Sequence, residues 1–325
     1  MRPLKATINH QALLNNLDCV KGMASKSKVM AVLKANAYGH SLLDVAKTLN
    51  TADGFAVLSI DEAAILKENF PNHTVLLLEG FFDKSEVKLA SKFGVNVTIH
   101  NQRQIDLIEE VKPNYPINIH LKINTGMNRL GFMPAEISYL LESLGSNPYI
   151  AEIVLMTHFS TADEETGVEK QLRAFNLISD NYNYLASVAN SAAIIRYPET
   201  RLDWVRPGIM IYGLSPFEDK SSKDLGLTPA MSLTSEIIAV QEIKAGDSVG
   251  YGLDFKSDKD MRIGIVACGY ADGYPRHARK GTPVAIDGQI SNLIGRVSMD
   301  MLYVDISQIT NANIGSKVEL WGEQV

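Results

Sequence analysis

Features that assign a protein to a specialised class are scarce in this chain of 325 residues. It has only two cysteines, Cys19 and Cys268, so it is not a disulfide-rich scaffold. One bridge between them is conceivable, but both lie in apolar patterns, and we expect two buried free thiols in a reducing compartment. No apolar run approaches the roughly 20 residues that a membrane-spanning helix needs, and no apolar signal segment opens the chain. We therefore expect a cytoplasmic protein.

Long runs of lysine and arginine are also missing, and the formal net charge is −6. These features argue against nucleic acid as a partner. A small anionic ligand needs only a local group of cations, which the net charge does not exclude. The composition itself, 46 % hydrophobic and 21 % charged, is that of an ordinary globular protein. The length allows one large domain and a smaller one.

Short apolar runs alternate with segments of helical period from residue 10 to about residue 212. The eight runs that we predict as strands are 29–33, 55–58, 75–78, 95–99, 117–123, 153–156, 187–189 and 202–205. Helical patterns between them include 61–69, 84–93, 102–111, 135–144 and 169–183. Such alternation indicates an α/β protein with a parallel sheet, and eight repeats indicate a (β/α)₈ barrel. The chemistry of a barrel lies where its strands end.

The pattern changes after about residue 222 to short alternating runs separated by turn signals such as Asp287-Gly288. These runs are 232–240, 262–268, 283–286, 302–306 and 317–321. We therefore predict two domains: a barrel over residues 1–222 and a mostly β domain over residues 223–325. Thr7 and Ile8 form a possible first strand that joins the second domain.

Lys34 stands at the carboxyl end of the first predicted strand, after a continuous apolar run. Most lysines are solvated surface residues, but this position faces the mouth of the predicted barrel. Desolvation and neighbouring charges there can lower the pKa of a lysine. A neutral amine can then form a Schiff base with an aldehyde. Lys34 therefore predicts pyridoxal 5′-phosphate, an aldehyde cofactor that withdraws electrons from the α-carbon of amino acids.

A phosphate-bearing cofactor also needs an anion site, and barrels often form one from the loops after strands seven and eight. Asn190-Ser191 follows the seventh predicted strand, and Arg206-Pro207-Gly208-Ile209 follows the eighth. The Ser191 hydroxyl can donate to a phosphate, and the N–H groups of Gly208 and Ile209 can face it. Each segment by itself is typical of an ordinary turn. Their positions, however, are those that a phosphate requires.

Eight ordered blocks resemble bacterial alanine racemases, which are fold-type III pyridoxal-phosphate enzymes. The blocks are AVLKANAYGH, LKINTGMNRLGF, MTHFSTADE, ANSAA, VRPGIMIYG, VGYG, CGYADGYPR and GRVSMDM. The resemblance runs from residue 2 to the end of the chain. It implies a homodimer in which each chain has a barrel and a β domain. It also implies interconversion of L- and D-alanine, with D-alanine supplied to peptidoglycan precursors, and no metal.

The resemblance implies roles for residues of the first domain. Lys34 would hold the cofactor and act as the base on one face of the substrate. Lys122 is the position that bears a carbamate in many members. The residues expected around the cofactor are Tyr38, Arg129, His158, Asn190, Ser191, Arg206, Gly208 and Ile209. Among them, Arg206 would meet the pyridine nitrogen, Arg129 the phenolic oxygen and the substrate carboxylate, and His158 would bond toward Arg206.

Four residues of the second domain also receive roles from the resemblance. Tyr251 would be the base on the opposite face of the substrate and would come from the partner subunit. Met299, also from the partner, would help to bind the substrate carboxylate. Tyr270 and Asp300 would line the entrance.

The chain departs from the family pattern in its length. It ends at Val325, short of the usual length, and nothing in it matches the segment whose tyrosine donates to the cofactor phosphate. We therefore expect a truncated β domain and weaker cofactor retention. Two alternatives follow: a racemase of another small amino acid such as serine, since the sequence does not determine the size of the pocket, or a protein that binds pyridoxal phosphate but is weakly active.

Overall fold

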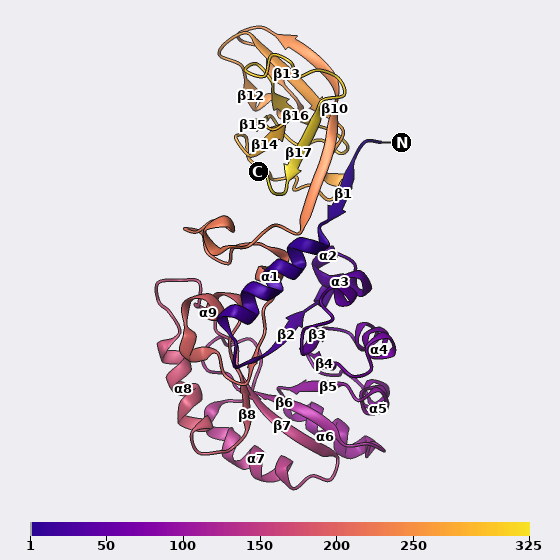
Figure 1. Ribbon diagram of the computed structural model, residues 1–325, viewed down its shortest axis with the longest axis vertical. Coiled ribbons are helices and arrows are strands. Elements are labelled where there is room, and N and C mark those ends of the chain that lie inside the picture. The colour runs from indigo at the N-terminus through magenta and orange to yellow at the C-terminus, as the bar shows by residue number, and fades with distance from the viewer. Residues whose placement is uncertain (1) are drawn as a thin grey trace. The chain divides into compact units, whose positions relative to one another are not determined.

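The computed structural model describes residues 2–325, which form two compact units (Figure 1). One unit is His10–Thr228, and the other combines residues 2–9 with Pro229–Val325. No helix within the described residues is both long and apolar enough to span a membrane.

The unit His10–Thr228 contains a closed barrel of eight parallel strands. These are β2 (Lys28–Val32), β3 (Gly54–Val57), β4 (Thr74–Leu77), β5 (Asn96–Ile99), β6 (Ile117–Lys122), β7 (Ile150–Met156), β8 (Leu185–Ser187) and β9 (Trp204–Val205). The barrel closes where β9 pairs with β2, with Trp204 opposite Lys28 and Val205 opposite Val29. The predicted (β/α)₈ barrel is confirmed, and each strand lies within a few residues of its predicted range.

One helix precedes the strands of the barrel, and the others connect them (Figure 1). They are α1 (His10–Met23), α2 (Lys34–Gly39), α3 (Leu42–Thr48), α4 (Ile60–Asn69), α5 (Lys84–Phe93), α6 (Gln102–Val111), α7 (Ile137–Gly145), α8 (Glu169–Ser179) and α9 (Ser191–Arg196). The helix predicted over residues 169–183 ends earlier, at Ser179. The Asn181 side chain donates to the Leu177 carbonyl there, and such side-chain bonds compete with further helix.

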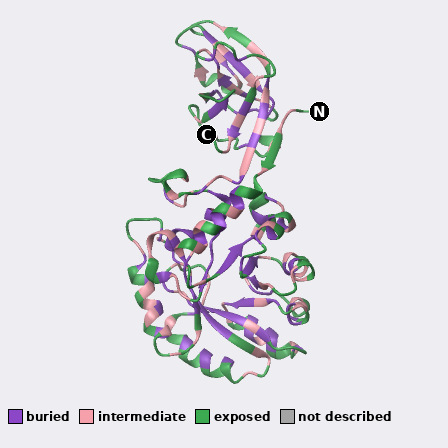
Figure 2. Cartoon of the chain, in the orientation of Figure 1, coloured by how far each residue is buried: buried purple, intermediate pink, exposed green. Residues whose placement is uncertain are grey.

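Apolar side chains at alternate strand positions fill the interior of the barrel. They form one buried cluster: Met30, Val32, Ala56, Leu76, Val154 and Trp204. Figure 2 shows the barrel strands as mostly buried, and all four residues of β3 are buried. Residues two apart in a strand point to the same side. The inward-facing residues that follow this cluster, toward the carboxyl ends of the strands, therefore lie at the mouth of the barrel.

The second unit contains a sheet of seven strands in the order β1-β10-β13-β16-β15-β14-β17, with β10 also pairing with β17. They are β1 (Lys5–Ile8), β10 (Met231–Ile243), β13 (Met261–Val266), β14 (Pro283–Ile286), β15 (Gln289–Ile294), β16 (Leu302–Asp305) and β17 (Lys317–Trp321). Two short strands, β11 (Ser248–Val249) and β12 (Phe255–Lys256), come between β10 and β13 in the sequence and pair with each other. The N-terminal strand β1 runs antiparallel to β10, with Ile8 opposite Met231.

Both cysteines are free thiols, as expected. Cys268 is buried in the core of the second unit. Cys19, however, is only half-buried, because α1 turns this position toward the surface. The expectation of two fully buried thiols was therefore wrong for Cys19.

Candidate active site

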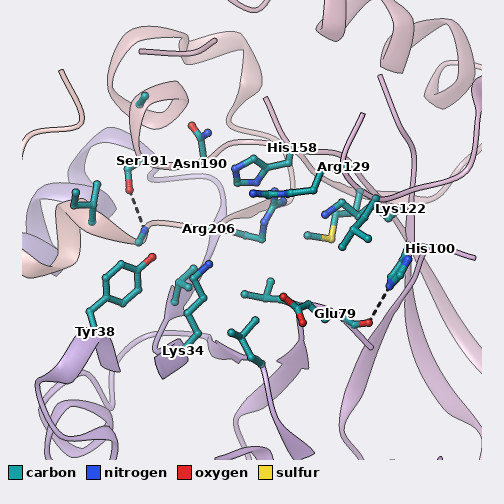
Figure 3. Close-up of a pocket in the computed structure, with 18 of the residues that line it drawn as sticks. Lys34, Tyr38, Glu79, His100, Lys122, Arg129, His158, Asn190, Ser191 and Arg206 are labelled. Atoms are coloured by element: carbon teal, nitrogen blue, oxygen red, sulfur yellow. Dashed lines mark hydrogen bonds between the residues drawn. The ribbon is translucent and has the colours of Figure 1, made fainter. Parts of the chain in front are cut away.

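A pocket of about 590 Å³ lies at the carboxyl ends of the barrel strands (Figure 3). This volume is typical of sites for small molecules and cofactors. Ten residues that the sequence singled out line it: Lys34, Tyr38, Lys122, Arg129, His158, Asn190, Ser191, Arg206, Gly208 and Ile209. The fold thus brings together residues that are up to 175 positions apart in the chain, from Lys34 to Ile209.

Lys34 and Tyr38 enter the pocket from one short turn directly after β2 (Figure 3). The residues from Ala35 to Tyr38 have φ between 52° and 54°, a left-handed conformation. Such a conformation costs roughly 1–2 kcal/mol for each residue that is not glycine. Hydrogen bonds from outside the turn hold it, since Asn36 N donates to Glu62 Oε1 at 2.9 Å and Asn36 Oδ1 accepts from Leu42 N at 2.8 Å. The sequence did not predict the left-handed conformation of this turn.

Tyr38 and Gly208 form a close-fitting corner of the pocket. The Tyr38 ring stacks on Tyr212, with the ring centroids 4.6 Å apart. A Cβ atom on Gly208 would lie 2.8 Å from Tyr38 Oη, so only glycine fits without displacing the tyrosine. The Gly208 N–H donates to Ser191 Oγ at 2.9 Å. The expectation that this N–H faces a ligand was therefore wrong, because the neighbouring hydroxyl accepts it. The Ser191 hydroxyl keeps its own proton to donate.

Replacing Gly208 by alanine is expected to weaken the binding of pyridoxal 5′-phosphate about tenfold, since overpacking by one methyl typically costs 1–3 kcal/mol. The new methyl group would push Tyr38 away from the corner. Titration of the apoprotein with the cofactor, followed by intrinsic fluorescence, measures this affinity. Gly22→Ala is the matched control, because no atom would lie within 4 Å of its new Cβ. Equal affinities in the two variants would rule out the close fit.

Arg206 is a buried residue of the pocket lining and connects the ends of two strands. Its Nη1 donates to the carbonyl and to the hydroxyl of Ser187, both at 2.7 Å, and its Nη2 donates to Thr157 O at 2.7 Å. Burial lowers the pKa of Arg206 to about 10, so the guanidinium stays protonated at neutral pH. The expected hydrogen bond between His158 and Arg206 is not among those made by residues 2–325. The carbonyl oxygens at the ends of β7 and β8 occupy both Nη atoms instead.

Two further side chains in this region have strongly shifted pKa values. Burial, and then the charges of Arg206 and Arg129, lower the pKa of Lys122 to about 8. Burial and the nearby cations, Arg206 first, lower the pKa of His158 to about 3, so its imidazole is neutral. The pocket therefore contains an amine that loses its proton easily beside an uncharged histidine.

Glu79 and His100 also line the pocket, and the sequence analysis missed both. His100 Nε2 donates to the Glu79 carbonyl at 3.0 Å, and Gln104 Nε2 donates to the same oxygen at 2.9 Å. These bonds fix the backbone of Glu79 while its carboxylate points into the pocket (Figure 3). A signal was present, because each residue follows the carboxyl end of a strand, β4 or β5.

The charges of the pocket suit an anionic cofactor. Four lining side chains are cationic, Lys34, Lys122, Arg129 and Arg206, whereas two carry carboxylates, Glu79 and Asp163. The amine of Lys34 at one wall suits the aldehyde of such a cofactor. The corner formed by Tyr38 and Gly208 at another wall suits its phosphate group. Residues 2–325 contain no group of three or more His, Cys, Asp or Glu side chains that could hold a metal ion.

Comparison with known proteins agrees with this arrangement. Residues 8–216 match the family model for the alanine racemase N-terminal domain, and residues 230–325 match the one for its C-terminal domain. The chain belongs to the alanine racemase family. The resemblance seen in the sequence is thereby confirmed.

Individual alanine racemases are similar over nearly the whole chain. The one from Nitrosospira multiformis is 48% identical over 324 residues, which are 99% of this chain and 91% of that protein. The one from Nitrosomonas eutropha is 50% identical over 327 residues, again with 99% and 91% coverage. The crystal structure of the biosynthetic alanine racemase from Pseudomonas aeruginosa matches with a TM-score of 0.98 and 43% identity, over 100% of this chain and 92% of that one.

The other four residues that the alanine racemase resemblance singled out belong to the second unit. Tyr251 begins a 3₁₀ turn, Tyr251–Leu253, and its side chain is 72% exposed. Tyr270, Met299 and Asp300 lie on two adjoining segments, because Tyr270 N donates to Ser298 O at 3.1 Å. The structure thus brings these three together within one unit.

Proposed function

We propose that the protein is an alanine racemase that interconverts L-alanine and D-alanine with pyridoxal 5′-phosphate held by Lys34. The cytoplasm would be its location, and D-alanine for peptidoglycan precursors its product. The observation that supports this proposal most strongly is that Lys34 and the distant residues Ser191 and Arg206 line one pocket in a member of this family.

Racemisation requires a proton to leave one face of the α-carbon and another to arrive at the opposite face. When bound, pyridoxal phosphate withdraws electrons from that carbon and makes its proton acidic. The Lys34 amine exchanges the proton on one face. The phenol of Tyr251 from a second copy of the chain exchanges it on the other. Two bases on opposite faces do this without turning the substrate.

The remaining pocket residues bind and orient. The hydroxyl groups of Ser191 and Tyr38, together with Ile209, would hold the phosphate, and the Asn190 side chain caps the adjoining helix by accepting from Ala193 N. Arg206 would face the pyridine nitrogen and would not transfer a proton to it, because arginine keeps its proton and stays charged. Arg129 holds the substrate carboxylate, which its planar guanidinium can bind with two hydrogen bonds. His158 packs near the ring in its neutral form.

A homodimer completes the proposed site. Tyr251 and Met299 are 72% and 58% exposed in the single chain. Large side chains that are exposed in this way are suited to contact another molecule. We propose that the Met299 of the second copy helps to bind the substrate carboxylate and that its Tyr270 and Asp300 line the entrance.

The proposal is tested by measuring D-alanine formation from L-alanine with added cofactor. The expected result is D-alanine formation that depends on the cofactor and is faster than D-serine formation from L-serine. Faster reaction with serine would assign a different substrate. Cofactor binding without either reaction would overturn the catalytic proposal.

Lys122 is expected to form a carbamate by adding carbon dioxide. The uncharged amine attacks the carbon of CO₂ and releases one proton, and a pKa of about 8 leaves a substantial uncharged fraction near neutral pH. At constant dissolved CO₂, the carbamate should therefore increase as the pH rises through this value and decrease below it. Nuclear magnetic resonance with isotopically labelled CO₂ measures it. The same signal in Lys122→Ala would contradict the assignment.

A further inference from the structure

The residues that the proposed function places at the entrance rest on two chain segments that contact each other through their backbones. We call residues 269–274 and 298–300 the entrance platform. Tyr270 N donates to Ser298 O at 3.1 Å, and Ala271 N donates to Met299 O at 2.9 Å. A Cβ atom on Gly269 would lie 2.5 Å from Asp300 N, so no side chain fits between the segments.

One arginine at the start of the chain bonds to both segments of the entrance platform. Arg2 Nη1 lies 2.6 Å from Asp272 Oδ1, and Arg2 Nη2 donates to Asp300 O at 2.5 Å. The other carboxylate oxygen of Asp272 accepts from Gly269 N at 2.9 Å. The Asp272 carboxylate therefore binds both Arg2 and the backbone of its own segment. The Arg2 guanidinium also binds the backbone of the second segment.

The two sides of this contact differ in exposure: the Arg2 side chain is 45% exposed, so water partly screens the ion pair, whereas its carboxylate partner is more enclosed. The Asp272 side chain is only 16% exposed, which reduces screening by water. Burial raises the pKa of Asp272, but the bonds from Arg2 and Gly269 outweigh it and leave this pKa lowered. Arg2 also comes just before β1, whose pairing with β10 holds the nearby backbone in place. The nearby backbone therefore loses little further freedom when the guanidinium binds, and the entropy cost comes from ordering the arginine side chain.

One end of the entrance platform is held by the core of the unit, because Tyr274 is buried and stacks on Trp321 with the ring centroids 5.7 Å apart. Tyr270 is partly exposed and Met299 is largely exposed, so neither side chain is anchored in the core. Met299 and Asp300 follow the buried Ser298, and the backbone bonds between the segments and the Arg2 guanidinium join them to the first segment.

We propose that Arg2 is a positioning residue for the entrance platform and that it sets the affinity for the amino-acid substrate by holding Met299 and Asp300 in place. This inference rests on the proposed function, because the family resemblance is what gives these residues a role toward the substrate. Arg2 itself touches neither the substrate nor the cofactor and takes no part in proton transfer.

The test compares Arg2→Met with the wild type, both with any affinity tag at the C-terminus. Loss of a charge-assisted bond should raise the KM for alanine about tenfold, whereas kcat should change by less than about threefold. Hydrogen exchange followed by mass spectrometry should show faster exchange of the amides of Tyr270 and Ala271. Arg2→Lys keeps the charge but lacks the planar fork with which the guanidinium bonds to both segments, so its KM should lie between the other two.

Arg103→Met is the matched control, because Arg103 also forms an exposed ion pair, with Glu110 at 2.6 Å on α6. It should leave KM and platform exchange unchanged. If Arg2→Met lowers the melting temperature but leaves KM unchanged, Arg2 has only a structural role and the inference fails. If the wild type does not racemise alanine but Arg2→Met still accelerates exchange, the proposed function fails and the contact between Arg2 and the platform stands.

Discussion

Replacing Lys34 by alanine is expected to lower kcat for alanine racemisation by about 10³-fold or more, because one substitution removes both the proposed attachment point of the cofactor and a proposed base. The side chain is half-buried and projects into the pocket, so the fold should tolerate its loss. The melting temperature should therefore stay close to that of the wild type. D-alanine formation with excess cofactor measures the effect.

Two further measurements make the Lys34 prediction specific. Lys47→Ala removes an exposed lysine from α3 and should leave kcat unchanged. Borohydride reduction fixes the cofactor to the amine that holds it, and peptide mapping should then find the label on Lys34. A label on Lys122 or on any other lysine would mean that the cofactor is attached elsewhere.

Replacing Tyr251 by phenylalanine is expected to lower kcat by about 10³-fold in both directions, since positioned acid–base groups typically contribute 10²–10⁴-fold. The effect on α-proton exchange should be unequal. Lys34 would still exchange the α-proton of the enantiomer that presents it to this face, whereas exchange of the other enantiomer should stop. Nuclear magnetic resonance of each enantiomer in deuterium oxide measures the two rates separately.

The control for Tyr251 is Tyr139→Phe. Tyr139 on α7 is 74% exposed, close to the 72% of Tyr251, and the same hydroxyl is removed. This variant should racemise alanine at the wild-type rate. Equal loss of exchange for both enantiomers in Tyr251→Phe would contradict a two-base reaction with Tyr251 on one face.

Much of the fold could be predicted because its signals are local. The helix 84–93 agrees with the structure at both ends, where Asp83 accepts from the first backbone N–H groups and Gly94 adopts the left-handed conformation that ends a helix. The turn Asp287-Gly288 joins β14 and β15 with positive φ at both residues, as a tight hairpin requires. In such places neighbouring residues in the sequence determine the conformation.

Other features could not be predicted because distant residues determine them. The left-handed turn at Ala35–Tyr38 contradicts the ordinary preference of alanine and depends on bonds from Glu62 and Leu42. The Gly208 N–H bonds to Ser191 instead of facing a ligand, and Arg206 bonds to strand ends instead of His158. Sequence spacing does not reveal which of several possible acceptors lies closest.

The sequence by itself determined the alternation of strands and helices, the positions of Lys34, Ser191 and Arg206 at strand ends, and the family. Hydrophobic period and capping residues act over a few positions and are therefore visible in the chain. Only the tertiary structure decided that Glu79 and His100 share the pocket, that burial gives Lys122 a pKa of about 8, and that Arg2 bonds to both segments near Met299. Burial and charge proximity depend on which distant segments meet in space, and that is settled only when the chain has folded.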